Sequence, residues 1–386
     1  MTKTTKKLLA IVLSSLLIFS CGISALAAYE PATKTLRFNE DGKFTIMQFA
    51  DCQDDDEVAP AMIAFMNEAL DEVKPDLVVF TGDNVVTENF TVGANAIIEP
   101  VASRGIPYAI TFGNHDYECC KISREEMLDY FCEIGECITT DAVPEIYGCG
   151  NCNNLIYASD GSMNPVFNLW FIDSNDYDST GAGKYDCVHA DQIEWYKSTS
   201  EAIEANYGRK IPSLLFQHII VPEIYDVFNT VGINKVDVAL GAVSSFVKGN
   251  TKFSGYLLEF PCSPVTNEGQ FDAAVERGDI LGMAFGHDHT NSFVATYKGI
   301  DIIQSPSCTY ESYGNDLTRG ARVFTLDEND PWSYESYVLT VKELALRDGS
   351  TIPQDKDNVK VFSLMFYQFI ERILNTLKRI LAMFIK

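Results

Sequence analysis

Short apolar runs that each end at a polar residue recur along the first third of the chain. Residues 44–50 and 76–81 form two such runs, and their length is typical of buried strands. Between them, apolar residues recur at intervals of three and four over residues 58–73, which predicts a helix with one buried face. The two strands and the helix together form a predicted β-α-β unit.

The alternation of strands and helices continues toward the C-terminus. Helical spacing recurs over residues 94–103 and 190–205, and short β segments fill residues 292–341. Further strands are predicted at residues 108–112, 167–173, 213–217 and 280–285. No sequence repeat of fixed period is visible, so we predict one large α/β domain over residues 29–345 rather than a solenoid.

Polar side chains follow the carboxyl ends of five of these predicted strands. Four of the five histidines in the chain lie at such junctions, and only His189 lies elsewhere. Because α/β sheets bind ligands at the carboxyl ends of their strands, the five junctions predict one common site. Its candidate residues are Asp51, Asp83, Asn114, His115, Asp116, His218, His287 and His289.

These residue types suit a pair of metal ions. Two cations about 3.5 to 4 Å apart need a carboxylate that bridges them, with neutral nitrogen and oxygen ligands on either side. Asp83 is the natural bridge, and the other oxygens and imidazoles surround it in this prediction. Such mixed ligands suit Zn, Mn, Fe or Ni better than a thiolate site would.

The same junctions resemble the five ordered motifs of the calcineurin-like metallophosphoesterases. The order and spacing of the motifs cover residues 44–323, and the run from His218 to Glu223 resembles the purple-acid-phosphatase-like branch. The motifs read Asp51-Cys52-Gln53, Gly82-Asp83-Asn84, Gly113-Asn114-His115-Asp116, Gln217-His218 and Gly286-His287-Asp288-His289.

The resemblance implies a four-layer α/β fold, in which a central β-sandwich is flanked by helices and carries a dimetal site at the carboxyl ends of its strands. It also implies how the ligands divide between the ions. One ion would be bound by Asp51, Asp83 and His289. The other would be bound by Asp83, Asn114, His218 and His287.

One position departs from the family pattern. The first motif of the family usually ends in histidine, and Gln53 stands there in this chain. A glutamine can offer only a neutral amide oxygen, which is a weaker donor to zinc than imidazole. We therefore expect Gln53 to bind the first ion weakly, and that ion to be a harder one such as Mn, Mg or Ca. The acidic run at residues 54–57 either assists that ion or forms a solvated loop.

The function that the resemblance implies is hydrolysis of a small phosphate ester by a metal-bound hydroxide, since cations lower the pKa of bound water. The expected cofactors are two divalent or trivalent ions of Mn, Zn, Fe or Mg. His115 is the expected general acid, and Asp116 is expected to orient it. Two alternatives stay open: a phosphodiesterase for nucleotide or lipid head-group diesters, and a metal-binding module that lost catalysis through Gln53.

The charge of the chain argues against a nucleic-acid polymer as partner. The sequence has 54 acidic and 29 basic residues, for a formal net charge of -25. Proteins that bind the phosphate backbone present a basic surface, and this chain has no overall positive field to supply one.

The two ends of the chain differ from its middle. Residues 1–28 show a basic start, an apolar run and small residues, so we expect a cleaved signal peptide and an extracellular or cell-surface protein. A retained anchor, or a lipid on Cys21, is the alternative. Residues 346–386 read as a linker and a basic amphipathic helix. This helix is expected to contact a membrane surface or a partner, or to pack on the core.

Cysteines are abundant for a chain of this size. Six of the eleven lie between Cys119 and Cys152. In an exported protein such a cluster is usually a disulfide framework, and this is our expectation. A structural zinc site and free thiols are the alternatives, and the pairing cannot be deduced from spacing.

Overall fold

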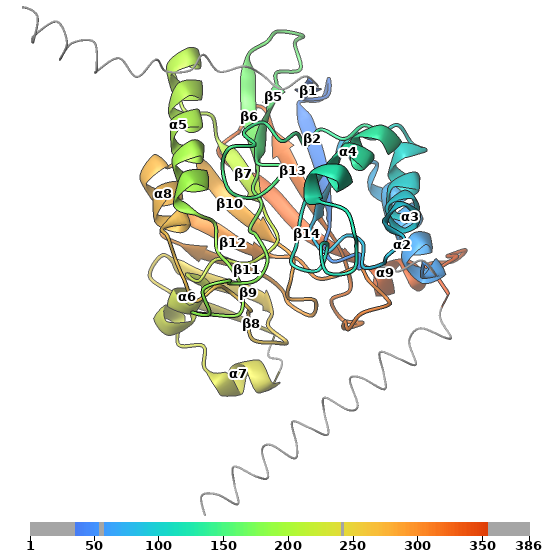
Figure 1. Cartoon of the computed structure of the whole chain (residues 1–386). Coiled ribbons are helices and arrows are strands. Elements are labelled where there is room, and N and C mark those ends of the chain that lie inside the picture. Colours follow the sequence, from blue (N-terminus) through green and yellow to red (C-terminus); the bar gives the residue numbers. More distant parts are fainter. Residues whose placement is uncertain (1–34, 54–57, 241–242, 354–386) are drawn as a thin grey trace, which may run out of the picture.

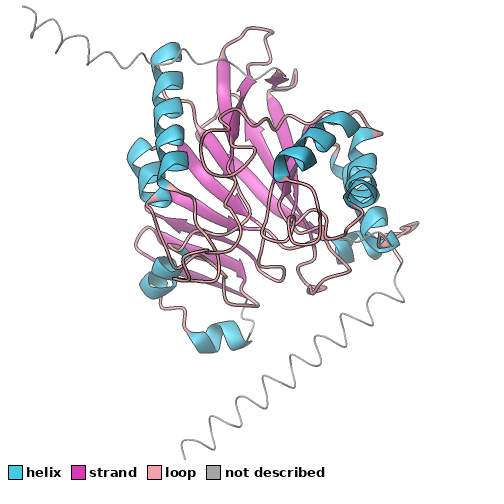
Figure 2. Ribbon diagram, viewed as in Figure 1, coloured by secondary structure: helices cyan, strands magenta, loops and turns pink. Residues whose placement is uncertain are grey.

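The computed structural model describes residues 35–53, 58–240 and 243–353, which form two β-sheets with helices on their outer faces (Figures 1 and 2). The smaller sheet has the strand order β14 (Tyr334–Thr340), β13 (Gly320–Asp327), β2 (Lys43–Phe49), β3 (Leu77–Thr81) and β4 (Tyr108–Thr111). The larger sheet has the order β1 (Leu36–Arg37), β5 (Cys152–Tyr157), β6 (Pro165–Phe171), β7 (Ser213–Phe216), β10 (Ile280–Phe285), β12 (Ile300–Gln304), β11 (Ser292–Tyr297), β9 (Thr251–Tyr256) and β8 (Val243–Lys248).

The helices cover the two sheets from opposite sides. Those that pack against the smaller sheet are α2 (Pro60–Val73), α3 (Phe90–Ala102), α4 (Arg124–Ile134) and α9 (Val341–Ala345). Those on the side of the larger sheet are α5 (Ala190–Tyr207), α6 (Ile224–Val231), α7 (Lys235–Leu240) and α8 (Gln270–Arg277). The result is the predicted four-layer architecture of helices, sheet, sheet and helices.

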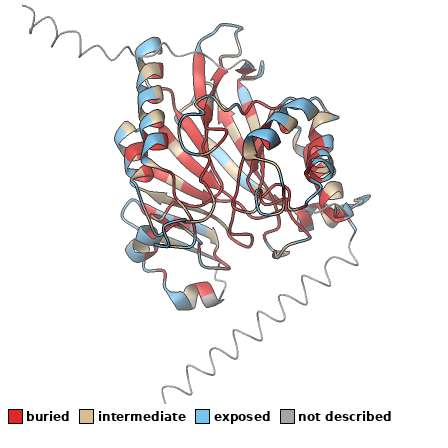
Figure 3. Ribbon diagram, in the orientation of Figure 1, coloured by how far each residue is buried: buried red, intermediate tan, exposed pale blue. Residues whose placement is uncertain are grey.

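Apolar side chains that point in alternate directions from one strand hold these layers together. In β3, Val79 packs into the core between the sheets, whereas Val78 and Phe80 pack under the helices. In β7, Leu214 lies between the sheets and Leu215 lies under the helices of the larger sheet. Figure 3 shows that the strands in the middle of the molecule are largely buried. Strands buried on both faces have continuous apolar sequences, which is why the sequence pattern located them.

The predicted elements agree with the observed ones in type and order, with ends that shift by a few residues. The fold prediction is therefore confirmed. The largest shift is at α3, which begins at Phe90 rather than at residue 94. Not predicted from the sequence were strands β1 and β5, the β8–β9 hairpin, and helices α4, α6, α7, α8 and α9. Strand β5 and the β8–β9 hairpin contain polar residues that break the apolar runs used to locate strands.

Three of the sequence predictions fall outside the described residues. These are the signal peptide at residues 1–28, the acidic run at residues 54–57 and the basic helix near the C-terminus. Within the described ranges, no helix combines the length and the apolar character that crossing a bilayer requires.

Candidate metal centre

Five strands bring the predicted ligands to one end of the sandwich. Asp51, Asp83 and Asn114 follow β2, β3 and β4, which lie side by side and parallel in the smaller sheet. His218 and His287 follow β7 and β10, which are parallel neighbours in the larger sheet. Parallel strands end at the same edge, so residues from distant parts of the chain meet there.

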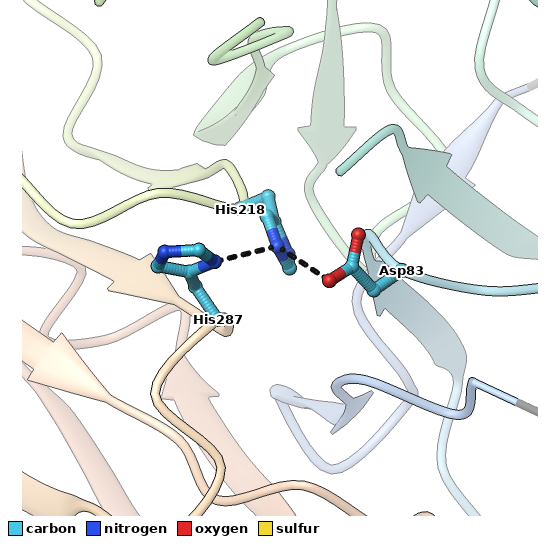
Figure 4. A group of neighbouring side chains, drawn as sticks. All are labelled: Asp83, His218 and His287. Atoms are coloured by element: carbon cyan, nitrogen blue, oxygen red, sulfur yellow. Dashed lines mark hydrogen bonds and ion pairs between the residues drawn. The ribbon is translucent and has the colours of Figure 1, made fainter. Parts of the chain in front are cut away.

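The first ligand group consists of Asp83, His218 and His287, whose ligand atoms all lie within 4.8 Å of one another (Figure 4). His218 Nε2 lies 3.1 Å from Asp83 Oδ2 and 3.2 Å from His287 Nδ1. The other nitrogen of His218, Nδ1, contacts the Thr81 carbonyl at 2.8 Å. That contact orients the ring so that Nε2 faces the group, as second ligand-shell contacts do in metal sites.

The second ligand group consists of Asp51, Asp83 and His289. His289 Nε2 lies 3.5 Å from Asp51 Oδ1, and His289 Nδ1 contacts the Tyr313 carbonyl at 2.7 Å. Asp83 belongs to both groups, which is the arrangement expected of a carboxylate that bridges two cations.

The backbone at these junctions is strained. Asp51, Asp83 and His287 have φ angles of 51°, 49° and 76°, and Gln53 has 37°. Residues other than glycine rarely adopt positive φ, and such conformations cluster at functional sites. Here the strained residues are those that turn from a strand end to present a side chain to the centre.

Two motif glycines are required because side chains of the centre pass close to them. A Cβ on Gly113 would lie 2.3 Å from Asp83 Oδ1, and a Cβ on Gly82 would lie 2.6 Å from His218 Nδ1. Either contact is too short for a real side chain, so the small residues in the motifs keep room for the ligands.

The residues present fit a pair of cations. Asn114 Oδ1 is buried with no hydrogen-bond partner among the described residues, while Asn114 Nδ2 donates to Tyr177 Oη at 3.1 Å. A buried carbonyl oxygen without a partner is costly, and a cation would satisfy it. Asp51 and Asp83 are likewise almost fully buried, at 0% and 1% exposure, and buried carboxylates need positive charge beside them.

The pKa values of two histidines of the centre shift in opposite directions. Burial by itself would lower the pKa of His218, but Asp83 and Asp51 outweigh it and raise this pKa to about 10. Burial lowers the pKa of His289 to about 4. Without cations, a proton on His218 therefore offsets the carboxylate charge, and metal binding is expected to displace it.

Gln53 lies in the site, as predicted, and contacts the shared carboxylate. Its Nε2 donates a hydrogen bond to Asp83 Oδ2 at 2.9 Å. In this orientation the amide supports Asp83 through its nitrogen. Coordination of a cation by the amide oxygen stays a prediction.

In the structure, the side chain that orients the His115 ring is Glu118 and not Asp116. His115 Nδ1 lies 2.5 Å from Glu118 Oε2. The carboxylate of Asp116 accepts hydrogen bonds from the backbone N–H groups of Gly113 and Asn84, each at 2.7 Å. Asp116 therefore holds the two motif loops together, and its predicted role toward His115 is corrected.

The centre opens into a cavity of about 270 Å³ whose walls include residues that the motifs did not indicate. Lys184 lies on this wall, and its Nζ is 2.6 Å from Tyr185 Oη. The ring of Tyr185 in turn packs edge-on against His287, with centroids 4.4 Å apart. These residues come from a loop between β6 and α5 with no motif of its own, so no sequence signal marked them. The other residues missed are Cys262, Ser312 and Tyr313.

The cysteines do not form the expected disulfide framework. The ten within the described ranges form no disulfide. Cys120 and Cys149 pack in the core under α2–α4, and Cys152 packs between the sheets. These side chains serve as small apolar residues in separate parts of the core, which spacing along the chain could not distinguish from a framework.

Comparison with known proteins agrees with this geometry. The family model described as calcineurin-like phosphoesterase matches residues 44–291. "Probable inactive purple acid phosphatase 14" of Arabidopsis thaliana is 31% identical over 78% of this chain and 80% of its own length. "Probable inactive purple acid phosphatase 29" of the same plant is 30% identical over 78% and 81%.

A similar solved structure is that of a dimetal phosphatase from Danio rerio. It covers 77% of this chain and 99% of its own, at 12% identity and a TM-score of 0.46. The family model and the two plant relatives carry the assignment: this chain belongs to the calcineurin-like phosphoesterase family and is similar to purple acid phosphatases.

Proposed function

We propose that this chain is an exported, dimetal-dependent phosphoesterase that hydrolyses phosphate esters and prefers monoesters. The observation that carries the proposal is that Asp83 lies in both ligand groups, with histidines from β7 and β10 around it. Export rests on the pattern of residues 1–28 alone.

When bound, the two cations would polarise the phosphoryl oxygens and acidify a water molecule. Asp51, Asp83 and His289 would hold one cation, and Asp83, Asn114, His218 and His287 the other. His115 lies on the same cavity wall as Asp83. From there its imidazole can donate a proton to the leaving oxygen, with Glu118 holding the ring.

The proposal is tested with full-length protein loaded separately with Mn, Zn, Fe or Mg and assayed on a panel of monoesters and diesters. Turnover that a chelator abolishes and that added metal restores is the expected result. A protein that binds two ions but hydrolyses no ester in the panel would instead be a metal-binding module, the second candidate function. Gln53 and the names of the two plant relatives favour testing that candidate directly.

Gln53→His is expected to strengthen metal binding at the Asp51 group. An imidazole is a better donor to zinc than an amide oxygen, so the affinity for Zn²⁺ should rise by about tenfold or more. Titration with a chromogenic chelator measures this affinity. Gln217→His is the control, because that buried glutamine donates to the Ile219 carbonyl and adds no ligand to the group. Unchanged affinity in Gln53→His would show that residue 53 does not reach the cation.

Lys184→Met is expected to reduce the preference for monoesters. A monoester carries one more negative charge than a diester, and the Lys184 ammonium at the cavity wall can bind it. Because this side chain is exposed, we expect kcat/KM to fall by only about tenfold for a monoester and about twofold for a diester. Steady-state rates on both esters measure the ratio. Lys298→Met, at an exposed lysine paired with Asp272, is the control. An equal loss on both esters would contradict the proposed role.

A further inference from the structure

A third group of potential metal ligands lies beside the two that share Asp83. Cys262, His287 and Asp288 each offer a ligand atom, and these atoms lie within 4.8 Å of one another. His287 and Asp288 follow β10, whereas Cys262 lies in the loop between β9 and α8. This group contains a thiol, and the other two groups contain only nitrogen and oxygen ligands.

Two atoms of this group are buried and have no hydrogen-bond partner among the described residues. They are His287 Nε2 and Asp288 Oδ2, on side chains of residues that are 7% and 1% exposed. The remaining polar atoms of these two residues are in use. His287 Nδ1 faces His218 (Figure 4), and Asp288 Oδ1 accepts the backbone N–H of Cys262 at 2.9 Å. A buried oxygen of a carboxylate that lacks a partner is costly, and a cation is one way to satisfy it.

We propose that Cys262, His287 and Asp288 form a separate site for a soft divalent cation, with Zn²⁺ as the best match. Its protein ligands are Cys262 Sγ, His287 Nε2 and Asp288 Oδ2. Three protein ligands of sulfur, nitrogen and oxygen type, with a fourth position open to water, suit zinc better than Mg or Mn.

His287 serves two cations in this arrangement, through nitrogens on opposite sides of its ring. Nδ1, which lies 3.2 Å from His218 Nε2, would bind the cation of the Asp83 group, and Nε2, which is buried without a partner among the described residues, would bind the cation of the new site. Binding at both nitrogens releases the remaining ring proton to solvent, and the Cys262 thiol loses its proton as well. No electron transfer is involved. Cys262 and His287 line the same cavity as Asp83, so the added cation lies in the wall of that cavity.

Cobalt spectroscopy on the full chain tests this site, because a thiolate bound to Co²⁺ gives an intense near-ultraviolet charge-transfer band that nitrogen and oxygen ligands do not give. Wild-type protein is expected to bind three equivalents of Co²⁺ and to show the band. Cys262→Ser is expected to bind two equivalents and to lack it. Cys132→Ser, at another exposed cysteine, is the control and should keep both. A wild-type protein without the band, or a band that persists in Cys262→Ser, would overturn the proposal.

A second measurement needs no variant. Folded wild-type protein is treated with iodoacetamide with and without Zn²⁺, and alkylated peptides are quantified by mass spectrometry. Zn²⁺ is expected to slow alkylation of Cys262 at least tenfold and to leave Cys132 unchanged, and equal rates at Cys262 would contradict the site. Both measurements are made without substrate. Loss of the proposed function would appear separately, as fewer than two equivalents bound by Cys262→Ser or as absent turnover.

Discussion

Replacing Asp83 by asparagine is expected to remove both cations and to lower kcat/KM by about 10³-fold or more. The side chain belongs to both ligand groups, so one substitution weakens both sites. A neutral amide has one coordinating oxygen and cannot bridge two ions as a carboxylate does. Because the cations supply several kcal/mol of transition-state stabilisation, their loss accounts for a change of this size. Elemental analysis of the purified variant and steady-state rates on a monoester measure the two effects.

The control for this substitution is Asp279→Asn. Asp279 is also buried, but it precedes β10, at the end of that strand opposite to the centre, and accepts hydrogen bonds from Tyr196 and Ser200. This variant is expected to retain both cations of the centre that contains Asp83. If Asp83→Asn also retained both cations of that centre with wild-type affinity, the shared carboxylate would not be the bridge, and the proposed function would lose its main support.

Replacing His115 by alanine is expected to leave both cations bound and to lower turnover in a way that depends on the leaving group. A general acid contributes about 10²- to 10⁴-fold when the leaving oxygen is a poor leaving group. An alkyl phosphate should therefore lose activity in that range, whereas p-nitrophenyl phosphate, whose leaving group needs little protonation, should lose much less. Measurement of kcat for both esters gives the comparison, and metal content is determined in parallel.

His189→Ala is the matched control for this variant. The His189 ring pairs with Asp186 at 3.0 Å and stacks on Tyr147, outside the ligand groups, so its removal should leave the ratio of the two rates unchanged. Glu118→Gln should reproduce part of the His115→Ala effect on the alkyl ester, because it weakens the contact that orients the ring. Equal losses on both esters in His115→Ala would assign His115 to substrate binding instead of proton transfer.

The metal ligands could be predicted from the sequence because the fold places them directly after strands that are easy to recognise. Buried parallel strands appear as apolar runs, and ligands at their carboxyl ends appear as polar residues directly after those runs. Asp51, Asp83 and His218 each occupy such a position. The scarcity of histidine strengthened the inference, since few histidines could have met by chance at strand ends.

Residues that reach the centre from loops could not be predicted from the sequence. Lys184 and Cys262 belong to segments without periodic pattern, and their approach to the cavity depends on how those loops pack over the sheet edge. Asp116 was misassigned for a related reason. Its place next to His115 in the chain suggested a contact, but the loop turns its carboxylate back to the backbone of Gly113 and Asn84.

The sequence by itself therefore determined three things. These are the α/β class, the strand ends that carry potential metal ligands, and Asp83 as the carboxylate most suited to bridge two cations. These follow from local periodicity and from residue chemistry, which need no knowledge of distant contacts. The pairing of Glu118 with His115, the cavity wall at Lys184 and the convergence of Cys262 with His287 and Asp288 arose only on folding. Side-chain contacts between segments distant in the chain depend on the packing of whole layers, and no local pattern encodes their distances.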